Sequence, residues 1–454
     1  MKSVSKSLSI MMLFAFLLVA AACTPNQEGG PEGGPEDAEG DAGGEEGGGE
    51  EAELEEGQME LRVAWWGSQT RHDRTLEVID LFEEEYPDIA VSTEYTGWDG
   101  YWERLATQAA SENLPDVIQM DLQYLAEYQS RDLIENLDPF IEEGTLDFED
   151  VDDIYLEGGE VEDELYAVNL GANSLTIVYD PAMFEEAGVP EFEPGYTWED
   201  YIDAAHQIRN HFGEEVYMAT PKDLHGFKHY LRQRDMWLYN EDNNGLGYDD
   251  DQLFIDYYNM WDDLLKEGIA PGPQITTEIE GLEDELIVHE KSPVLMPHSN
   301  QIVGLQSAAD RPLELALLPS EPGGTDGHFV KPSMFFSASS QSNAEEQEAA
   351  ALFIDFFTNN KEANEILAAE RGVPISKEVQ DHLYPQLEEY EQKQFDYMEV
   401  VEENSSPIHP PEPSGVGEIQ GIFERGLEEV EYGEITVEEF AEQFREEAEQ
   451  VLAD

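Results

Sequence analysis

Basic residues and cysteine are both scarce in this chain. Its 454 residues include 22 Lys and Arg against 104 Asp and Glu, which gives a formal charge of −82, and a single cysteine, Cys23. Binding to nucleic acid or to an anionic membrane through a basic face needs clustered Lys and Arg, so the composition excludes both. One cysteine cannot form a disulfide within the chain, and it excludes a zinc site built from several thiolates.

Apolar residues are present in quantity despite this charge. Hydrophobic residues make up 40% of the chain and aromatic residues 10%, more than a purely disordered acidic chain carries. A large core can therefore form. About 400 residues remain once the N-terminal segment is set aside, which is too many for one ordinary core and is typical of two lobes or domains.

The acidic residues are spread along the chain from Glu28 onward. Residues 58–454 alone hold 91 acidic and 20 basic residues, a net charge of −71. Self-repulsion of this size opposes a compact state, but molar salt screens it because the Debye length there is roughly 3 Å. We therefore expect an acidic, halophilic protein that is adapted to a saline medium.

The N-terminus has the pattern of an export signal. Lys2 and Lys6 precede an apolar run over residues 8–19, too short for a comfortable membrane span, and Ala20-Ala21-Ala22-Cys23 follows. This pattern resembles a bacterial lipoprotein signal peptide, in which residues 1–22 are removed and Cys23 is lipidated. The alternative is an ordinary secretory signal with an incidental cysteine. Acyl chains contribute about 0.8 kcal/mol per buried methylene, so lipid on Cys23 would hold the protein at the extracytoplasmic face of the cell membrane.

Residues 23–57 are expected to form a tether. They comprise the lipidated cysteine and a tract that contains thirteen acidic residues, eleven glycines and no Lys or Arg. Such a tract cannot bury apolar surface, and charge repulsion extends it. A solvated spacer between the lipid and the folded body is the expected role.

Strand and helix patterns alternate in residues 59–120. The expected order is a strand over 59–66, a helix over 70–86, a strand over 88–95, a helix over 100–111 and a buried strand over 116–120. This order predicts a parallel sheet with right-handed crossovers. Such sheets place ligands at the carboxyl ends of their strands.

The remainder of the body mixes short strands with helices. A long β-prone stretch begins at Tyr166, and Thr197 with Asp200 forms a plausible capping box for the next helix. Further helices are expected over 199–212, 223–239, 250–267, 344–358 and 361–369, and further extended segments over 294–296, 313–318 and 329–337. The segment after Lys377 is helix-rich and is interrupted by a proline-rich loop over 407–413.

An ordered set of motifs spans nearly the whole body. It includes Ala64-Trp65-Trp66-Gly67, Gly97-Trp98-Asp99-Gly100-Tyr101, Leu114-Pro-Asp-Val-Ile-Gln-Met-Asp121, Val178-Tyr-Asp-Pro-Ala-Met-Phe-Glu-Glu-Ala-Gly188, Tyr196-Thr-Trp-Glu-Asp200, Lys331-Pro-Ser-Met334 and Glu370-Arg-Gly-Val-Pro-Ile-Ser376. Together these motifs resemble the family 1 extracellular solute-binding proteins of ABC sugar importers. Within that family the set is most similar to the branch that handles plant-wall and pectin-type oligosaccharides.

The resemblance implies an α/β, periplasmic-binding-protein-like fold. Each of its two lobes would be a mainly parallel sheet flanked by helices, and a hinge of several strands would join them, with crossings near 172–179, 331–338 and 372–377. The N-terminal lobe would comprise residues 58–174 plus 336–373, and the C-terminal lobe residues 175–335 plus 374–454. Closure of the lobes over an oligosaccharide would present a joined surface to the permease.

The resemblance also implies the partners. The protein would be a monomer that delivers its sugar to the permease subunits of an ABC transporter, without cofactor, without turnover and without nucleic acid. The acidic body disfavours acidic saccharides at low salt, although screening removes most of this objection, and Arg71 or Arg371 could supply a local counter-charge.

A sugar site needs flat aromatic side chains against C–H faces and polar side chains that pair with hydroxyls. In the first lobe the candidates are Trp65, Trp66, Ser68, Arg71, Trp98 and Asp121. The alternative for each tryptophan is the lobe core, where large aromatic residues also dominate. Arg71 could donate to hydroxyls or a carboxylate, or pair with a neighbouring acid such as Asp73.

In the second lobe and at the hinge the candidates are Trp237, His298, Asn300, Met334, Phe335 and Arg371. His298 and Asn300 follow a short apolar strand, the position that Asp121 has in the first lobe. Because His298 follows a proline, it could equally cap a turn.

Residues 240–251 follow the spacing of a calcium loop, with Gly245 at the sixth position. The ligands would be Asn240, Asp242, Asn244 and Asp251, but Asn at the first position and Asp at the last reduce the charge and the bidentate reach. A glycine-containing turn between two helices is the favoured alternative.

The competing class of protein is a lipid-anchored glycoside hydrolase or polysaccharide lyase. Carboxylate pairs at any spacing occur by chance in so acidic a chain, so they discriminate nothing. The sequence lacks a nucleophile elbow, a glycine-rich phosphate loop and an HExxH motif. A sensor or adhesin that binds sugar without transport has the same chemistry and a different partner.

Overall fold

In the computed structural model the described residues are 48–49, 52, 54, 57–240, 243–279, 281–408, 412–413 and 415–453. Cys23, the expected signal over 1–22 and most of the expected tether over 23–57 lie outside them. The fold that follows is that of the body.

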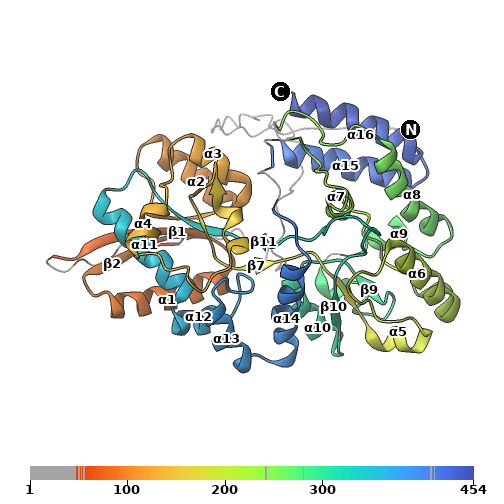
Figure 1. The fold of residues 1–454 in the computed structure, drawn as a ribbon, viewed down its shortest axis with the longest axis horizontal. Coiled ribbons are helices and arrows are strands. Elements are labelled where there is room, and N and C mark those ends of the chain that lie inside the picture. Colours follow the sequence, from red (N-terminus) through yellow and green to blue (C-terminus); the bar gives the residue numbers. More distant parts are fainter. Residues whose placement is uncertain are drawn as a thin grey trace, which may run out of the picture. The chain divides into compact units, whose positions relative to one another are not determined.

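A sheet of five strands has the order β2-β1-β3-β12-β6 (Figure 1). β1 runs parallel to both β2 and β3, as the alternating pattern predicted, whereas β12 pairs antiparallel with β3 and β6. The strands are β1 Met59–Trp66, β2 Ile89–Thr96, β3 Val117–Met120, β6 Val168–Asn169 and β12 Phe335–Ala338.

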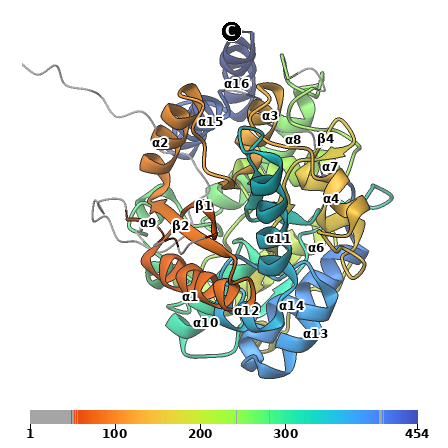
Figure 2. The same ribbon diagram turned by 90° about the vertical axis from the view of Figure 1, so that its left-hand side faces the viewer.

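Side chains of β1 alternate between two faces of this sheet, because successive residues of a strand point to opposite sides. Leu61, Val63 and Trp65 share a core cluster with Phe82 of α1 and residues of α11, while Ala64 and Trp66 share another with residues of α2 and α3. Figure 2 shows α1 and α11 beside β1 and β2. The helices of this part are α1 Gln69–Glu85, α2 Trp98–Ala110, α3 Leu122–Ser130, α4 Asp138–Glu143, α11 Ala344–Asn359 and α12 Lys361–Leu367.

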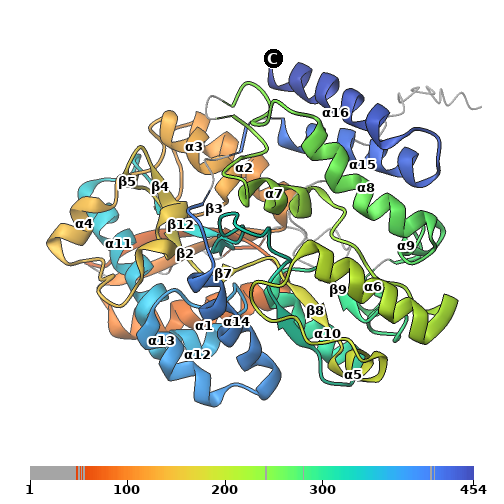
Figure 3. The same ribbon diagram turned by 45° about the vertical axis from the view of Figure 1, so that its right-hand side comes forward.

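A second sheet has three strands in the order β10-β8-β9, with a core of its own (Figure 3). The strands are β8 Ile177–Tyr179, β9 Val294–Leu295 and β10 Glu314–Ala316. The helices packed in this part are α5 Pro181–Ala187, α6 Trp198–Phe212, α7 Leu224–Arg232, α8 Gln252–Lys266, α9 Pro273–Thr276, α10 Ile302–Ala309, α15 Val416–Glu431 and α16 Val437–Leu452. Helix α6 has the predicted capping box of Thr197 and Asp200.

The expectation of a mainly parallel second sheet is wrong. β8 runs antiparallel to both of its neighbours, so β9 and β10 are parallel to each other on either side of it. Helix α10 connects β9 to β10 as a crossover, which makes those two strands parallel. β8 arrives from the neighbouring short strand β7 (Ala172–Asn173) and enters the sheet in the opposite direction. β12, which follows β11 (Lys331–Pro332), enters the first sheet in the same way.

Three segments that were expected to cross between the lobes lie side by side. β7 pairs antiparallel with β11, and Ala172 also bridges to Val373. The approach at Val373 is close, because a Cβ on Gly171 would lie 2.3 Å from the backbone oxygen of Arg371, and Gly372 has a φ of +106°. Glycine is needed at both positions.

Helix α14 (Glu389–Glu403) connects the two parts of the molecule. Phe395 and Met398 belong to the core cluster of the first sheet, while Lys393 pairs with Glu314 of β10 at 2.9 Å. Helix α13 (Lys377–Leu383) precedes it, and the strands β4 Glu160–Val161 and β5 Glu164–Leu165 form a hairpin. None of the helices in the described part of the chain combines the length and the apolar composition needed to cross a bilayer.

Two sequence expectations for elements differ from the structure. The β-prone stretch after Tyr166 is divided into three short strands, because its residues take part in two sheets and in the β7–β11 pair. The helix expected over 223–239 ends at Arg232, and the chain then turns at Asp235, which has a φ of 55°.

Candidate functional site

An aromatic cluster lies where β1 ends and α2 begins. Trp66 contacts Trp98 edge to face at a centroid distance of 4.9 Å, and Trp102 lies 5.6 Å from Trp66 and 3.9 Å from Tyr124. Trp98, Trp102 and Tyr124 are half-buried, whereas Trp66 is only 4% exposed. Half-buried rings of this kind can offer a face to a sugar, and Trp66 supports them from below.

Trp65 takes the core alternative. It is fully buried, its ring stacks on Tyr95 at 5.0 Å, and its Nε1 donates to Nδ1 of His72 at 3.0 Å. We therefore leave Trp65 out of the proposed site.

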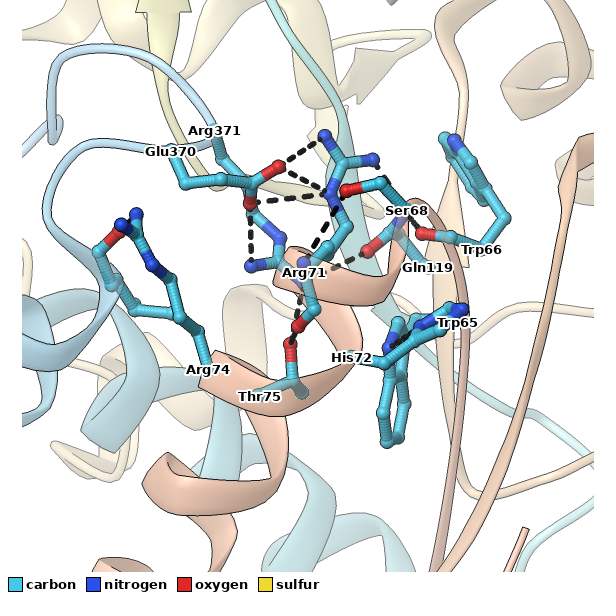
Figure 4. A network of polar contacts seen from close by, with 11 residues as sticks. Trp65, Trp66, Ser68, Arg71, His72, Arg74, Thr75, Gln119, Glu370 and Arg371 are labelled. Atoms are coloured by element: carbon cyan, nitrogen blue, oxygen red, sulfur yellow. Dashed lines mark hydrogen bonds and ion pairs between the residues drawn. The ribbon is translucent and has the colours of Figure 1, made fainter. Parts of the chain in front are cut away.

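Arg71 and Arg371 lie on either side of the Glu370 carboxylate (Figure 4). Arg71 donates through Nε to Oε1 of Glu370 at 2.9 Å and through Nη2 at 2.8 Å, and Nη1 of Arg371 lies 3.3 Å from Oε2. Nη2 of Arg371 also donates to Oγ1 of Thr75 at 2.8 Å. Arg71 therefore pairs with a residue 299 positions away and not with Asp73.

The electrostatics of this network favour its charged form. Burial opposes ionisation of Glu370, but the Arg71 and Arg371 guanidiniums outweigh it and hold the pKa of that carboxyl below its usual value. Burial, and then the charges of Arg71 and Arg371, lower the pKa of His72 to about 4. Two guanidiniums share one carboxylate, so the network keeps a net positive charge in a strongly acidic protein.

Ser68 and Asp121 cap helices. Ser68 is the exposed N-cap of α1, and its side chain accepts from the backbone N–H of Arg71 at 3.5 Å. Asp121 is the N-cap of α3 and accepts through Oδ1 from the backbone N–H of Gln123 at 3.0 Å. Both sit at strand ends, as predicted, and their side-chain oxygens also satisfy helix N–H groups.

Met334 and Phe335 are core residues on the segment that leaves β11. Met334 is 3% exposed and packs in the cluster that includes Trp66, and Phe335 is fully buried. Trp98, Trp102 and Tyr124 pack against the core cluster that contains both residues.

His298 and Asn300 lie beside β7. His298 bridges to Leu175, and the backbone N–H of Ser299 donates to the oxygen of Ser174 at 2.9 Å. Gln301 and His298 form a capping box for a short 3₁₀ turn, so the turn-capping alternative describes His298. Asn300, in the same turn, is half-buried, and its side chain makes no hydrogen bond within the described residues.

Trp237 lies over the guanidinium of Arg232 at 4.6 Å, and Phe329 lies at the same distance from that group. Arg232 donates to the backbone oxygens of Gly327 at 2.9 Å and Pro407 at 2.9 Å. Burial lowers the pKa of Arg232 to about 9. Trp237 thus belongs to a clamp that holds the start of the proline-rich loop against α7.

The described residues of the 240–251 segment have the contacts of a turn. Asn240 and Asn244 hydrogen-bond each other through their side chains at 3.0 Å, and Asp251 accepts from Nε of Arg445 at 2.6 Å. Asp242 lies outside the described residues. No group of three or more His, Cys, Asp or Glu in the described ranges is placed to hold a metal ion.

Two hollows occur elsewhere, between α8, α15 and the loop before α9. The larger is an open hollow of about 480 Å³, lined by residues such as Tyr217, Gln274 and Tyr432. The smaller is largely apolar and adjoins Trp261 and Phe440. Neither is lined by a predicted site residue.

Sequence reasoning missed Trp102, Tyr124, His225, Lys331 and Glu370. A signal existed for Trp102, because it follows Trp98 by four residues on α2 and so shares its helix face. Glu370 stands directly before Arg371. Lys331 is the first residue of the motif Lys331-Pro-Ser-Met334, but only the fold shows which groups surround it.

Comparisons with known proteins support the family resemblance that the sequence motifs suggested. Residues 77–394 match the family model described as bacterial extracellular solute-binding protein. A family 1 extracellular solute-binding protein from Alicyclobacillus acidocaldarius is 29% identical, with 87% of this chain and 99% of that chain covered and a TM-score of 0.78. A periplasmic oligogalacturonide-binding protein from Yersinia enterocolitica is 25% identical, with 87% and 99% covered and a TM-score of 0.72.

A third solved structure supports the fold alone. The cyclic α-maltosyl-1,6-maltose-binding protein from Arthrobacter globiformis is 19% identical, with 87% of this chain and 100% of that chain covered and a TM-score of 0.68. The two-lobed α/β fold class expected from the sequence is the one that these proteins share. The family model covers well over half of the chain, and we conclude that the chain belongs to the bacterial extracellular solute-binding proteins.

Proposed function

We propose that this protein captures an oligosaccharide between its two lobes and delivers it to the permease subunits of an ABC transporter. The observation that carries the proposal is the cluster of half-buried rings, Trp98, Trp102 and Tyr124, at the carboxyl ends of parallel strands. Ligands bind at that edge in open α/β sheets. The oligosaccharide named for the Yersinia relative supports the class of ligand.

The lobes of the proposal are those expected from the sequence. The N-terminal lobe comprises 58–174 plus 336–373, and the C-terminal lobe 175–335 plus 374–454. The side-by-side segments around β7, β11 and Val373 are well suited to serve as the hinge, because short paired strands can absorb a rotation at few residues. Closure about them would bury the sugar from both sides.

Anchoring is the second component of the proposal. Cys23 carries lipid, residues 23–57 tether the body, and the monomeric protein acts at the extracytoplasmic face of the membrane. Labelling of cells with radioactive palmitate should mark the wild-type protein and leave a Cys23→Ser variant unlabelled. Equal labelling of both would contradict lipidation at Cys23.

Binding and turnover are separated by one incubation. The protein is titrated calorimetrically with oligosaccharides, and the sugar is then recovered and assayed for new reducing ends and for unsaturated products. Saturable binding with unchanged sugar supports the receptor. Progressive appearance of either product supports a hydrolase or lyase and contradicts the proposal.

A further inference from the structure

Lys331 is exceptional among the lysines of this acidic chain. Half-buried lysines elsewhere have carboxylate partners, as in the pairs Lys222–Glu431, Lys228–Glu412 and Lys393–Glu314. Lys331 is also half-buried, but within the described residues its Nζ contacts only the backbone oxygen of Pro332, at 3.5 Å. A partly desolvated ammonium without a counter-charge is unfavourable. An anionic ligand that pairs with Lys331 is therefore the simplest explanation for a lysine at this position.

Two imidazoles surround the same space. The rings of His225 and His298 are 5.9 Å apart, edge to face, and the charge of Lys331 acts on both. His298 is fixed through Leu175, and Lys331 pairs in register with Asn173, so both are anchored to the same short stretch of chain. These groups therefore form one constellation.

The two imidazoles are neutral at pH 7. Burial, and then Lys331 and His225, lower the pKa of His298 well below its usual value. The side chain of His225 is exposed to solvent, but desolvation by the surrounding protein also lowers its pKa, with Asp223 opposing the shift and Lys228 adding to it. Each neutral ring offers one N–H donor, and Lys331 supplies the positive charge.

The nearby carboxylates are occupied by other partners. Asp223 is the N-cap of α7 and accepts from the backbone N–H of Gly226 at 2.8 Å, and Glu412 pairs with Lys228. The charge of Lys331 is thus left for a ligand.

Polar groups suited to hydroxyls accompany this charge. Oδ1 of Asn173, a residue only 7% exposed, and Oγ of Ser333 are buried and have no hydrogen-bond partner within the described residues. Asn300 likewise has an amide without a partner there. Buried polar atoms normally find partners, so the two buried oxygens of Asn173, the register partner of Lys331, and of Ser333, two residues after it, indicate a polar ligand.

This constellation adjoins the aromatic cluster. Met334, which packs in the cluster with Trp66, stands three positions after Lys331, and three extended residues span at most about 10 Å. A sugar stacked on the rings can therefore place a ring substituent near Lys331.

We propose that Lys331, with His225 and His298 as N–H donors, binds the carboxylate of a uronic-acid residue in the oligosaccharide. The inference rests on the proposed function and narrows its substrate class to acidic oligosaccharides. Arg71 and Arg371 are not assigned to the uronate carboxylate, because both already pair with the carboxylate of Glu370.

The test uses saturated digalacturonic acid and its methyl ester, which share shape and hydroxyls and differ in charge. In titrations of the full chain the acid should bind more tightly than the ester. Lys331→Met should weaken binding of the acid by about 10- to 100-fold, the effect of losing a charged hydrogen bond, and change binding of the ester by less than about 3-fold. Lys291→Met is the matched control, because Lys291 is exposed and has no ion pair in the described part of the chain. It should bind both sugars as wild type does.

The outcomes distinguish failure of the inference about Lys331 from failure of the proposed function. Equal binding of the acid by wild type and Lys331→Met overturns the inference, as does a wild-type preference for the ester or for neutral oligosaccharides, and in these cases the proposed function stands. If Lys331→Met binds neither sugar, Lys331→Arg is measured, and failure of that variant as well overturns the inference in favour of a structural role. Absence of binding to acidic, esterified and neutral oligosaccharides alike ends the proposed function and the inference together.

Discussion

The two polar regions near the proposed site differ in how far the protein satisfies its own charges. Around Glu370, two arginines pair with one carboxylate, and Arg371 also donates to Thr75. Around Lys331, the ammonium has no carboxylate partner and the buried oxygens of Asn173 and Ser333 have no hydrogen-bond partner within the described residues. Both regions adjoin the paired segments around β7, because Lys331 pairs with Asn173 and the backbone of Arg371 approaches Gly171.

This difference distinguishes groups that stabilise the fold from groups that are available to bind a ligand. A buried network whose members pair with one another fixes the local structure, and removing one member leaves an uncompensated charge. A set of polar groups without internal partners contributes little to the fold and is available to a ligand. Position beside the paired segments therefore does not identify a ligand-binding residue, whereas the hydrogen bonds and ion pairs of its side chain do.

The largest expected effect concerns the Glu370 network. Glu370→Gln leaves two guanidiniums buried without a carboxylate and should lower the free energy of unfolding by about 3–5 kcal/mol. Arg131→Met breaks an exposed pair with Glu127 and should cost at most about 1 kcal/mol. Urea unfolding in molar salt compares the two variants. A loss below 1 kcal/mol for Glu370→Gln would mean that the network does not stabilise the fold.

The next effect contrasts two tryptophans. Trp98→Ala should weaken oligosaccharide binding by about 2 kcal/mol or more, the scale of an aromatic hot spot, with a smaller change in the unfolding temperature. Trp65→Ala should instead lower the free energy of unfolding by about 3–5 kcal/mol, because it leaves a cavity in the core. Calorimetric titration and thermal unfolding of both variants measure the contrast. Unchanged oligosaccharide affinity of Trp98→Ala would show that this ring does not contribute to sugar binding.

A smaller effect concerns pH. His72 has a pKa of about 4 in the fold, below its ordinary value of 6.5, so its contribution to stability is complete above pH 6.5 and is lost as the pH falls toward 4. The loss is at most about 1.4 kcal/mol per pH unit for one histidine. Glu370, whose pKa lies below its usual 4.5, acts only in a more acidic window. His72→Gln should flatten the profile of unfolding free energy between pH 6.5 and 4.5, and an unchanged slope would contradict the assignment.

The smallest effect concerns the 240–251 segment. Asn240 and Asn244 bond each other and Asp251 pairs with Arg445, so millimolar calcium and a chelator should give the same unfolding temperature. An increase of several degrees with calcium, which bound ligand produces through mass action, would establish the metal site instead. Asp251→Asn, which weakens the Arg445 pair, serves as the control for a purely structural role.

Local pattern in the sequence predicted much of the first sheet, because the strand over 59–66, the helices on either side and the parallel order follow from short-range periodicity. The antiparallel second sheet was not predictable in this way, since the direction of β8 depends on its entry from β7. The same limit applied to the site. Trp98 was predicted from its place after a strand and lies in the aromatic cluster of the proposed site, whereas the partner of Arg71 is 299 residues away. That Lys331 has no carboxylate partner within the described residues depends on the whole fold.

Amide hydrogen exchange with and without an acidic oligosaccharide locates the ligand on the chain. We expect slower exchange at residues 98–102, 298–301 and 331–334 together, with little change around α8 and α15. Protection confined to the hollow beside Tyr217 and Tyr432 would contradict an oligosaccharide held between the lobes. Protection of 98–102 without 298–301 and 331–334, or the reverse, would contradict it as well.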